Sequence, residues 1–122
     1  MPELLDHIDL RVRDRKAATR FYDAFLRQLG AVKNEGPEYT TWRVPPGSVD
    51  SFGIIEERAL VAGSTRIAFR APSRESVDAV AELLPGIGAR AVEMDDGIYG
   101  DNYHGVFFED PDGNQLEVCI QS

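Results

Sequence analysis

The chain has 122 residues, of which 43% are hydrophobic and 28% are charged, and this length and composition predict one globular domain. The formal net charge of −8 argues against a nucleic-acid-binding protein, because such proteins carry basic surfaces that neutralise phosphates. A membrane span needs about 20 consecutive apolar residues, and the sequence has no such stretch.

The first half of the chain predicts a strand, a helix and three further strands. Ile8, Leu10 and Val12 alternate with polar residues, as in a strand that buries one face. Asp14 is a suitable N-cap for the helix that follows, and Gly30 is a suitable end for it. The three strands expected after this helix are Ala31–Glu35, Tyr39–Val44 and Phe52–Glu57.

The second half repeats this pattern at a constant offset of 59 residues. The segment "RIAFRAPSRESVDAV" from Arg66 aligns without a gap with "HIDLRVRDRKAATRF" from His7 (66 − 7 = 59). Ser73 is the expected N-cap of the second helix, and Pro85-Gly86 is its expected end. The strands expected after it are Ala89–Asp95, Gly105–Glu109 and Gln115–Ile120. We expect two β-α-β-β-β modules, residues 1–60 and 61–122, that pack as one domain, because about 60 residues bury little core alone.

The alternation of side chains predicts which residues share the face of the sheet that carries no helix. Glu117 lies between Leu116 and Val118 in the strand after the turn "EDPDGN". Because these apolar neighbours should face the helix, Glu117 should lie on the opposite side. The same rule places His7 and Arg66 on the helix-free face. If the two half-sheets curl toward each other, this face lines a cup that holds an imidazole, a guanidinium and a carboxylate.

These features resemble the vicinal oxygen chelate superfamily, which includes glyoxalases, bleomycin resistance proteins and extradiol dioxygenases. The resemblance covers essentially the whole chain and rests on the paired modules, the opening "DHIDLRV" and the ending "FFEDPDGNQLEV". It implies an α+β fold in which the modules form a curled mixed sheet around a central cup, with the helices on the outer face. In metal-dependent relatives this cup holds a divalent ion, such as Zn, Ni, Fe or Mn. A His on the first strand of each half and a Glu on the last strand bind the ion.

Carried over to this chain, the resemblance implies His7 and Glu117 as metal ligands. Glu56 is an optional further ligand, if "IE" in "GIIEE" is aligned with "LE" in "NQLEV". The second His position is Arg66, whose guanidinium stays protonated and has no lone pair for a metal. Arg66 would instead pair with a carboxylate or bind an anionic ligand.

Two functions remain open from these residues. The first is a metal-dependent lyase, isomerase or dioxygenase in which Glu117 is both a ligand and a catalytic group. The second is a metal-free protein that sequesters a small molecule and in which Arg66 replaces the cation. Fold resemblance alone does not transfer a reaction from one member of a family to another.

Further candidates lie near the predicted cup. His104 follows "IYGDNY" and precedes a glycine, which predicts a loop at the rim of the cup. There His104 would be a general base or a substitute metal ligand, or else a solvent-exposed loop residue. Three aromatic residues would line the cup and contact the ligand, or else fill the core: Trp42, Tyr103 and Phe107.

The expected partners are a small molecule and a second copy of the chain. A homodimer would protect apolar strand edges at the ends of the modules. Cys119 is the only cysteine, which excludes an internal disulfide and favours a reducing compartment. We therefore expect a cytoplasmic homodimer.

Overall fold

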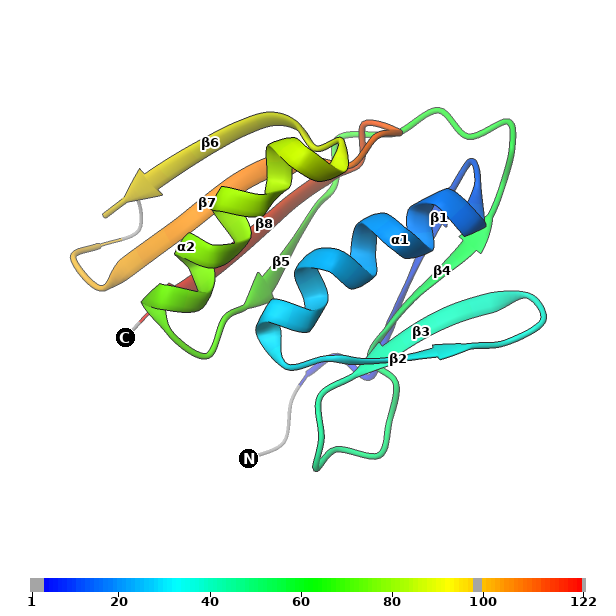
Figure 1. Cartoon of the computed structure of the whole chain (residues 1–122), viewed down its shortest axis with the longest axis horizontal. Helices are drawn as coiled ribbons and strands as arrows, with labels where there is room; N and C mark the ends of the chain where they lie inside the picture. The colour runs from blue at the N-terminus through cyan, green and yellow to red at the C-terminus, as the bar shows by residue number, and fades with distance from the viewer. Residues whose placement is uncertain (1–3, 98–99, 122) are drawn as a thin grey trace. The chain divides into compact units, whose positions relative to one another are not determined.

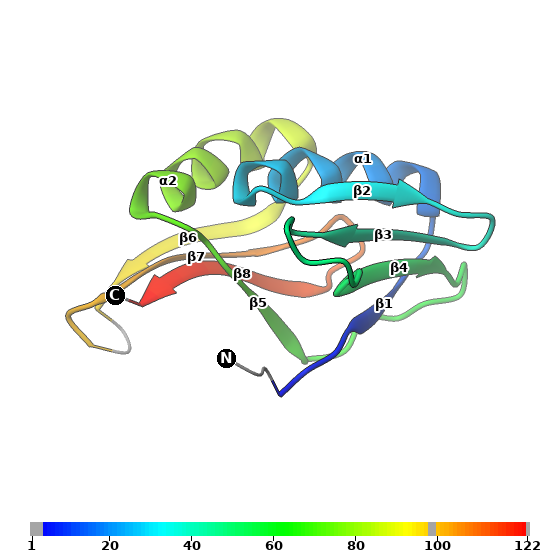
Figure 2. The same ribbon diagram turned by 90° about the horizontal axis from the view of Figure 1, so that it is seen from below.

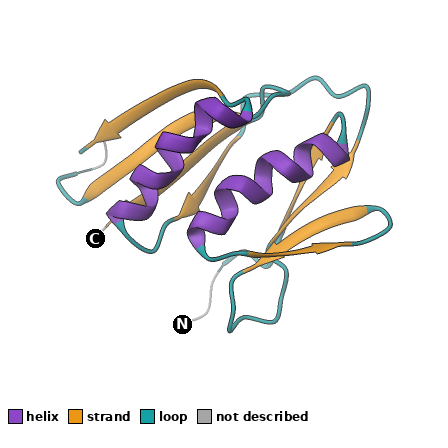
Figure 3. Cartoon of the chain, in the orientation of Figure 1, coloured by secondary structure: helices purple, strands orange, loops and turns teal. Residues whose placement is uncertain are grey.

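The computed structural model describes residues 4–97 and 100–121. The chain divides into two compact units, Met1–Leu60 and Val61–Ser122, and each contains one helix of the α type beside four strands (Figures 1 and 3). Among the described residues, no helix is long and apolar enough to cross a membrane.

The first unit is a four-stranded mixed sheet with one helix. Its elements are β1 (Ile8–Val12), α1 (Arg15–Leu26), β2 (Val32–Glu35), β3 (Tyr39–Arg43) and β4 (Phe52–Glu56). The strand order is β1-β4-β3-β2, with β1 parallel to β4 and the other pairs antiparallel. The Asp14 carboxylate caps α1 by accepting a hydrogen bond from the Ala17 amide. A short 3₁₀ turn, Arg27–Leu29, follows α1 and ends at Gly30, whose φ of 88° is left-handed.

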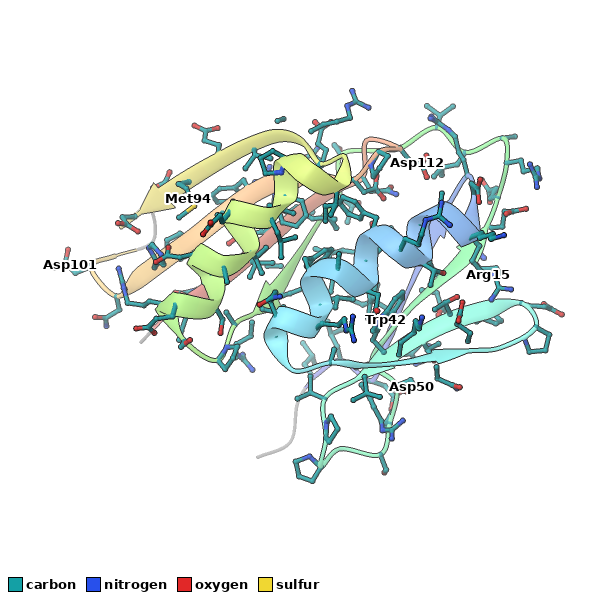
Figure 4. The ribbon with its side chains drawn as sticks, in the orientation of Figure 1. Arg15, Trp42, Asp50, Met94, Asp101 and Asp112 are labelled. Carbon is teal, nitrogen blue, oxygen red and sulfur yellow. The ribbon has the colours of Figure 1, made fainter. Side chains whose placement is uncertain are left out.

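Aromatic side chains join α1 to its sheet. The Tyr22 ring centroid on α1 lies 5.3 Å from that of Phe52 on β4 and 6.2 Å from that of Trp42 on β3. The indole N–H of Trp42 donates a hydrogen bond of 3.1 Å to Asp23, also on α1. Trp42 is almost fully buried, where β3 passes α1 (Figure 4). These contacts identify the α1 side of the sheet.

The second unit repeats the arrangement. Its elements are β5 (Arg66–Arg70), α2 (Arg74–Leu83), a 3₁₀ turn (Leu84–Ile87), β6 (Arg90–Asp96), β7 (Tyr103–Glu109) and β8 (Gln115–Gln121). The strand order is β5-β8-β7-β6, and β5 is parallel to β8. The Ser73 hydroxyl caps α2 by accepting a hydrogen bond from the Ser76 amide. Within this unit α2 runs along one side of the sheet (Figure 2), and the other side carries no helix of the unit.

The predicted α+β fold with two β-α-β-β-β modules is confirmed. Both N-caps are the predicted residues, and most strand ends agree within two residues. The turn after β7 has the predicted Gly113 in a left-handed conformation, with φ of 93°. The Asp110 carboxylate accepts hydrogen bonds from the amides of Asp112 and Asn114, which holds this turn in shape. β7 begins at Tyr103, two residues before the predicted start at Gly105.

Candidate functional site

Strand pairing assigns each residue of the second sheet to one of its two sides. His104 Nε2 lies 2.7 Å from Asp78 Oδ1 on α2, so His104 faces that helix. Side chains alternate along β7, and the register of β8 and β5 extends this assignment across the sheet. We call the opposite side the open face. On β5, β7 and β8 it includes Arg66, Ala68, Arg70, Tyr103, Gly105, Phe107, Glu109, Gln115, Glu117, Cys119 and Gln121.

Glu117 lies at the centre of the open face and is 5% exposed. The hydroxyl of Tyr103 donates a hydrogen bond of 2.8 Å to its Oε2 atom, and the Cys119 thiol is its neighbour on the same strand face. None of the ion pairs formed by the described residues includes Glu117. The groups in contact with this buried carboxylate are therefore neutral. They offset less of the free-energy cost of its burial than a cationic partner would.

Tyr103 reaches Glu117 by crossing the backbone of Gly105. A Cβ atom at Gly105 would lie 2.5 Å from Cζ of the Tyr103 ring, which is too close for any side chain. Glycine at this position is therefore the condition for the Tyr103–Glu117 hydrogen bond. A glycine inside a strand pattern commonly marks such a close approach.

Arg66 lies over an aromatic ring of the same face. Its guanidinium carbon is 4.7 Å from the centroid of the Phe107 ring, and its Nη2 donates a hydrogen bond of 3.2 Å to Gln115 Oε1. The Phe107 ring stacks on Tyr103 at 6.4 Å between centroids, and Phe107 is the register partner of Glu117. The guanidinium, two rings and the carboxylate therefore form one continuous cluster.

The donor atoms of the open face do not fit a divalent cation. Arg66 has no lone pair to donate, and one oxygen of Glu117 already accepts the Tyr103 hydroxyl. Burial, followed by the neighbouring Glu117 carboxylate, raises the pKa of the Cys119 thiol to about 11, so this group is no thiolate at neutral pH. No group of three or more His, Cys, Asp or Glu residues that could hold a metal ion is found in the described parts of the chain.

The position of His104 in the structure differs from the predicted one. It lies in β7 and not in a loop, and it is 9% exposed on the side that faces α2. Its ring hydrogen-bonds Asp96 on β6 and Asp78 on α2. These two bonds, that to Asp96 first, raise the pKa of His104 although burial opposes the shift. Because His104 and Glu117 lie on opposite sides of the sheet, His104 is not a general base for the open face.

Glu56 also lies on the helix side of its own sheet. It pairs in register with Val12, and its Oε1 accepts a hydrogen bond of 3.0 Å from the amide of Arg15, the first residue of α1 (Figure 4). The equivalent registers of β1–β4 and β5–β8 match Gly53, and not Glu56, with Glu117. The alignment that made Glu56 a metal ligand is therefore wrong, because strands are matched by pairing and not by similar dipeptides.

The remaining predicted residues of the first unit are His7 and Trp42. The His7 side chain is 55% exposed just before β1, and its Nδ1 lies 2.8 Å from Asp6 Oδ1. That hydrogen bond, followed by the charge of Asp9, raises the pKa of His7. Trp42 packs in the α1 core, which is the second of its two interpretations. That His7 joins Arg66 and Glu117 in one cavity stays a prediction.

Two residues of the open face were not singled out in the sequence. Gln115 holds Arg66 in place, and Gly105 makes room for Tyr103. The signal for Gly105 was a glycine between aromatic residues in an alternating strand, which we interpreted as a loop. No local signal marks Gln115, because its role depends on a neighbour 49 residues away.

Comparisons with known proteins identify the family. The model of the Glyoxalase/Bleomycin resistance protein/Dioxygenase superfamily matches residues 4–118. The chain is 30% identical to the uncharacterized protein YqjT of Bacillus subtilis (strain 168), over 97% of this chain and 99% of that protein. The crystal structure of a glyoxalase/bleomycin resistance protein from Albidiferax ferrireducens T118 is 25% identical, with a TM-score of 0.82 over 98% of this chain and 100% of that one.

A more distant likeness concerns the fold alone. The fosfomycin resistance protein FosX from Listeria monocytogenes is 22% identical, with a TM-score of 0.69 over 100% of this chain and 96% of that one. This likeness shows that the two proteins share a fold. On the strength of the family model and the full-length relative, the chain belongs to the Glyoxalase/Bleomycin resistance protein/Dioxygenase superfamily.

Proposed function

We propose that this protein binds a small anionic aromatic molecule without a metal, and that the open face of the second unit is its binding site. The observation that carries the proposal is the Arg66 guanidinium, which lies on the Phe107 ring at the position where metal-dependent relatives are expected to have a histidine. The superfamily description names resistance proteins beside enzymes, and a sequestering role agrees with this site.

Arg66 has hydrogen-bonding capacity to spare. A guanidinium has five N–H donors, and the contact with Gln115 uses one of them. Its guanidinium carbon lies 4.7 Å from the centroid of the Phe107 ring, and the N–H edge that Gln115 does not use has no hydrogen-bond partner among the described residues. No ion pair within the described residues includes Arg66. A carboxylate or another planar anion would fit this edge in a bidentate arrangement.

The aromatic side chains supply the apolar part of the site. Phe107 is half-buried beside the fully buried Tyr103, so an apolar ring placed here would lose water contact on one side. The low polarity of this surface would strengthen the attraction between Arg66 and an anion relative to bulk water. Small-molecule sites typically combine such apolar surfaces with a few polar groups that set the orientation.

A metal-dependent lyase, isomerase or dioxygenase is less well supported by these residues. A divalent ion beside Glu117 would meet the fixed positive charge of Arg66, and it would gain no ligand from that residue. We therefore assign Arg66 the electrostatic role that a metal has in metal-dependent relatives, and we derive no reaction step through a metal.

The test is a titration of the ¹⁵N-labelled protein with 4-methylbenzoate, followed by NMR. We expect amide shifts in β5, β7 and β8, and we expect Arg66→Gln to weaken binding at least about tenfold. Arg27→Gln is the matched control, because Arg27 is an exposed residue that follows α1 and the charge change is the same. Equal binding by wild type and Arg66→Gln would refute the role of Arg66.

Metal content is a separate arm of this experiment. Protein expressed with added Mn, Fe, Ni and Zn is analysed by inductively coupled plasma mass spectrometry. Stoichiometric metal that is lost in Glu117→Gln would overturn metal independence and favour the metal-dependent enzyme.

A further inference from the structure

Among the charged residues of the open face, Arg66 and Glu117 have opposite signs and do not pair with each other. Arg66 contacts Phe107 and Gln115, whereas Glu117 contacts Tyr103 and Cys119. In the register, Arg66 is aligned with Gln115, and Ala68 is aligned with Glu117. The two charged residues thus lie two strand positions apart, which corresponds to about 7 Å along the strands.

The two charged groups are separated by an apolar surface. Ala68 and Phe107 are the register partners of Glu117 on β5 and β7. Ala68 is exposed and small, so the carboxylate can be approached from the β5 side. Phe107 lies beneath Arg66 and stacks on Tyr103. Neither neighbour can form a hydrogen bond to Glu117 through its side chain.

Glu117 lacks a cationic partner although it is buried. Within the described residues its hydrogen-bond donor is the Tyr103 hydroxyl, and its neighbour on the same strand face is the Cys119 thiol. A buried carboxylate gains most from a positively charged donor, because a charge-assisted hydrogen bond in a low-polarity site is stronger than a neutral one. The described residues place no such donor in contact with it.

Resting on the proposed function, we infer that the ligand of the open face is a small zwitterion, with an acidic group for Arg66 and an ammonium group for Glu117, joined by an apolar spacer. The acidic group uses the free edge of the guanidinium. The spacer covers Ala68 and Phe107. The ammonium group approaches Glu117 over Ala68 and donates to the carboxylate oxygen that Tyr103 does not occupy.

Three probes of equal ring size test this inference. The zwitterion 4-(aminomethyl)benzoate has both charges, 4-methylbenzoate has only the acid, and 4-methylbenzylamine has only the ammonium. We expect the wild-type protein to bind the zwitterion at least about tenfold more tightly than 4-methylbenzoate in NMR titrations. 4-Methylbenzylamine should bind more weakly than the zwitterion, because it leaves Arg66 unused.

The variant Glu117→Gln tests whether Glu117 is the residue that binds the ammonium group. The glutamine amide oxygen can still accept a hydrogen bond from the Tyr103 hydroxyl, so the contact between residues 103 and 117 is kept. We expect this variant to bind the zwitterion and 4-methylbenzoate with similar affinity. Arg27→Gln again serves as the control and should preserve the wild-type preference.

The outcomes separate the two proposals. Equal affinity of wild type for the zwitterion and 4-methylbenzoate would overturn the inference and leave the anion-binding function intact. A preference for the zwitterion that persists in Glu117→Gln would also overturn it. Binding of 4-methylbenzylamine with no binding of either acid would overturn the proposed function, and the inference with it. Failure of all three probes to bind would count against both.

Discussion

The hydroxyl group of Tyr103 donates a 2.8 Å hydrogen bond to the carboxylate of Glu117 on the neighbouring strand. We predict that Tyr103→Phe lowers the free energy of unfolding by about 2 kcal/mol, because a buried carboxylate loses a charge-assisted hydrogen bond while the ring packing is kept. Urea denaturation measures this change. Tyr39→Phe is the control, since it removes a hydroxyl from an exposed ring and should change stability by less than about 0.5 kcal/mol. Equal losses in the two variants would contradict the prediction.

Gly105 and Tyr103 should be strongly coupled. Gly105→Ala would force the Tyr103 ring away from its place, so we expect a large loss of stability in the wild type and a small one in a Tyr103→Ala background. The coupling energy from this double-mutant cycle should be about 1–3 kcal/mol. Gly86→Ala is the control, because nothing lies within 4 Å of a Cβ placed there. Additive effects at positions 103 and 105 would show that the ring does not limit position 105.

Arg66→His should create affinity for a divalent cation. The substitution removes a fixed positive charge and adds an imidazole lone pair on the face that carries Glu117. We expect Zn²⁺ to bind at least about tenfold more tightly than to Arg66→Gln, which removes the same charge without adding a ligand. Isothermal titration calorimetry measures both affinities. If the two variants bind Zn²⁺ alike, residue 66 does not point toward a metal site.

His104 should make stability depend on pH. Hydrogen bonds to Asp96 and Asp78 raise its pKa in the folded protein above the ordinary 6.5, so folding favours the protonated ring. This stabilisation is complete below the unfolded pKa and is lost as the pH rises through the folded pKa. Besides these two carboxylates, Arg74 on α2 lies near the ring, 3.9 Å from Asp96.

The measurement compares wild type with His104→Gln by urea denaturation. The stability advantage of wild type should shrink as the pH rises from about 6 to about 9. The effect should be modest, because both carboxylates are mostly exposed. An advantage that stays constant over this range would contradict a protonated His104.

We predict a homodimer that uses an edge strand. β2 and β6 are edge strands of their sheets, and Val32, Val92 and Met94 on them are exposed (Met94 is labelled in Figure 4). Light scattering should give twice the chain mass of 13.5 kDa, which is about 27 kDa. Val92→Lys should shift the protein toward the monomer, whereas Val61→Lys, in the exposed connection, should not. A monomeric wild type would refute the prediction.

Local patterns predicted most of the fold. Alternation in β1 and β5, the caps at Asp14 and Ser73 and the turn at Gly113 all depend on residues close in sequence, and all were correct. The same alternation correctly placed Arg66 and Glu117 on one side of their sheet. These features follow from backbone geometry that each segment adopts by itself.

The errors concern residues whose position depends on distant partners. Glu56 was matched with Glu117 by a similar dipeptide, but the pairing of β1 with β4 shifts the match to Gly53. His104 was assigned to a loop because of the glycines around it, although Gly105 lies within β7. Whether Trp42 lines a site or fills a core depends on contacts with α1 that a single sequence does not specify.

The crossing of Tyr103 over Gly105 also constrains the order in which substitutions at these two positions can occur. A larger residue at position 105 is tolerated only after Tyr103 has been replaced by a smaller residue. The two substitutions can therefore occur in only one order. Once position 105 has gained a side chain, restoring the tyrosine is blocked by the same overlap. Lineages in which position 105 has gained a side chain should therefore seldom regain the pair, because glycine must return before tyrosine can.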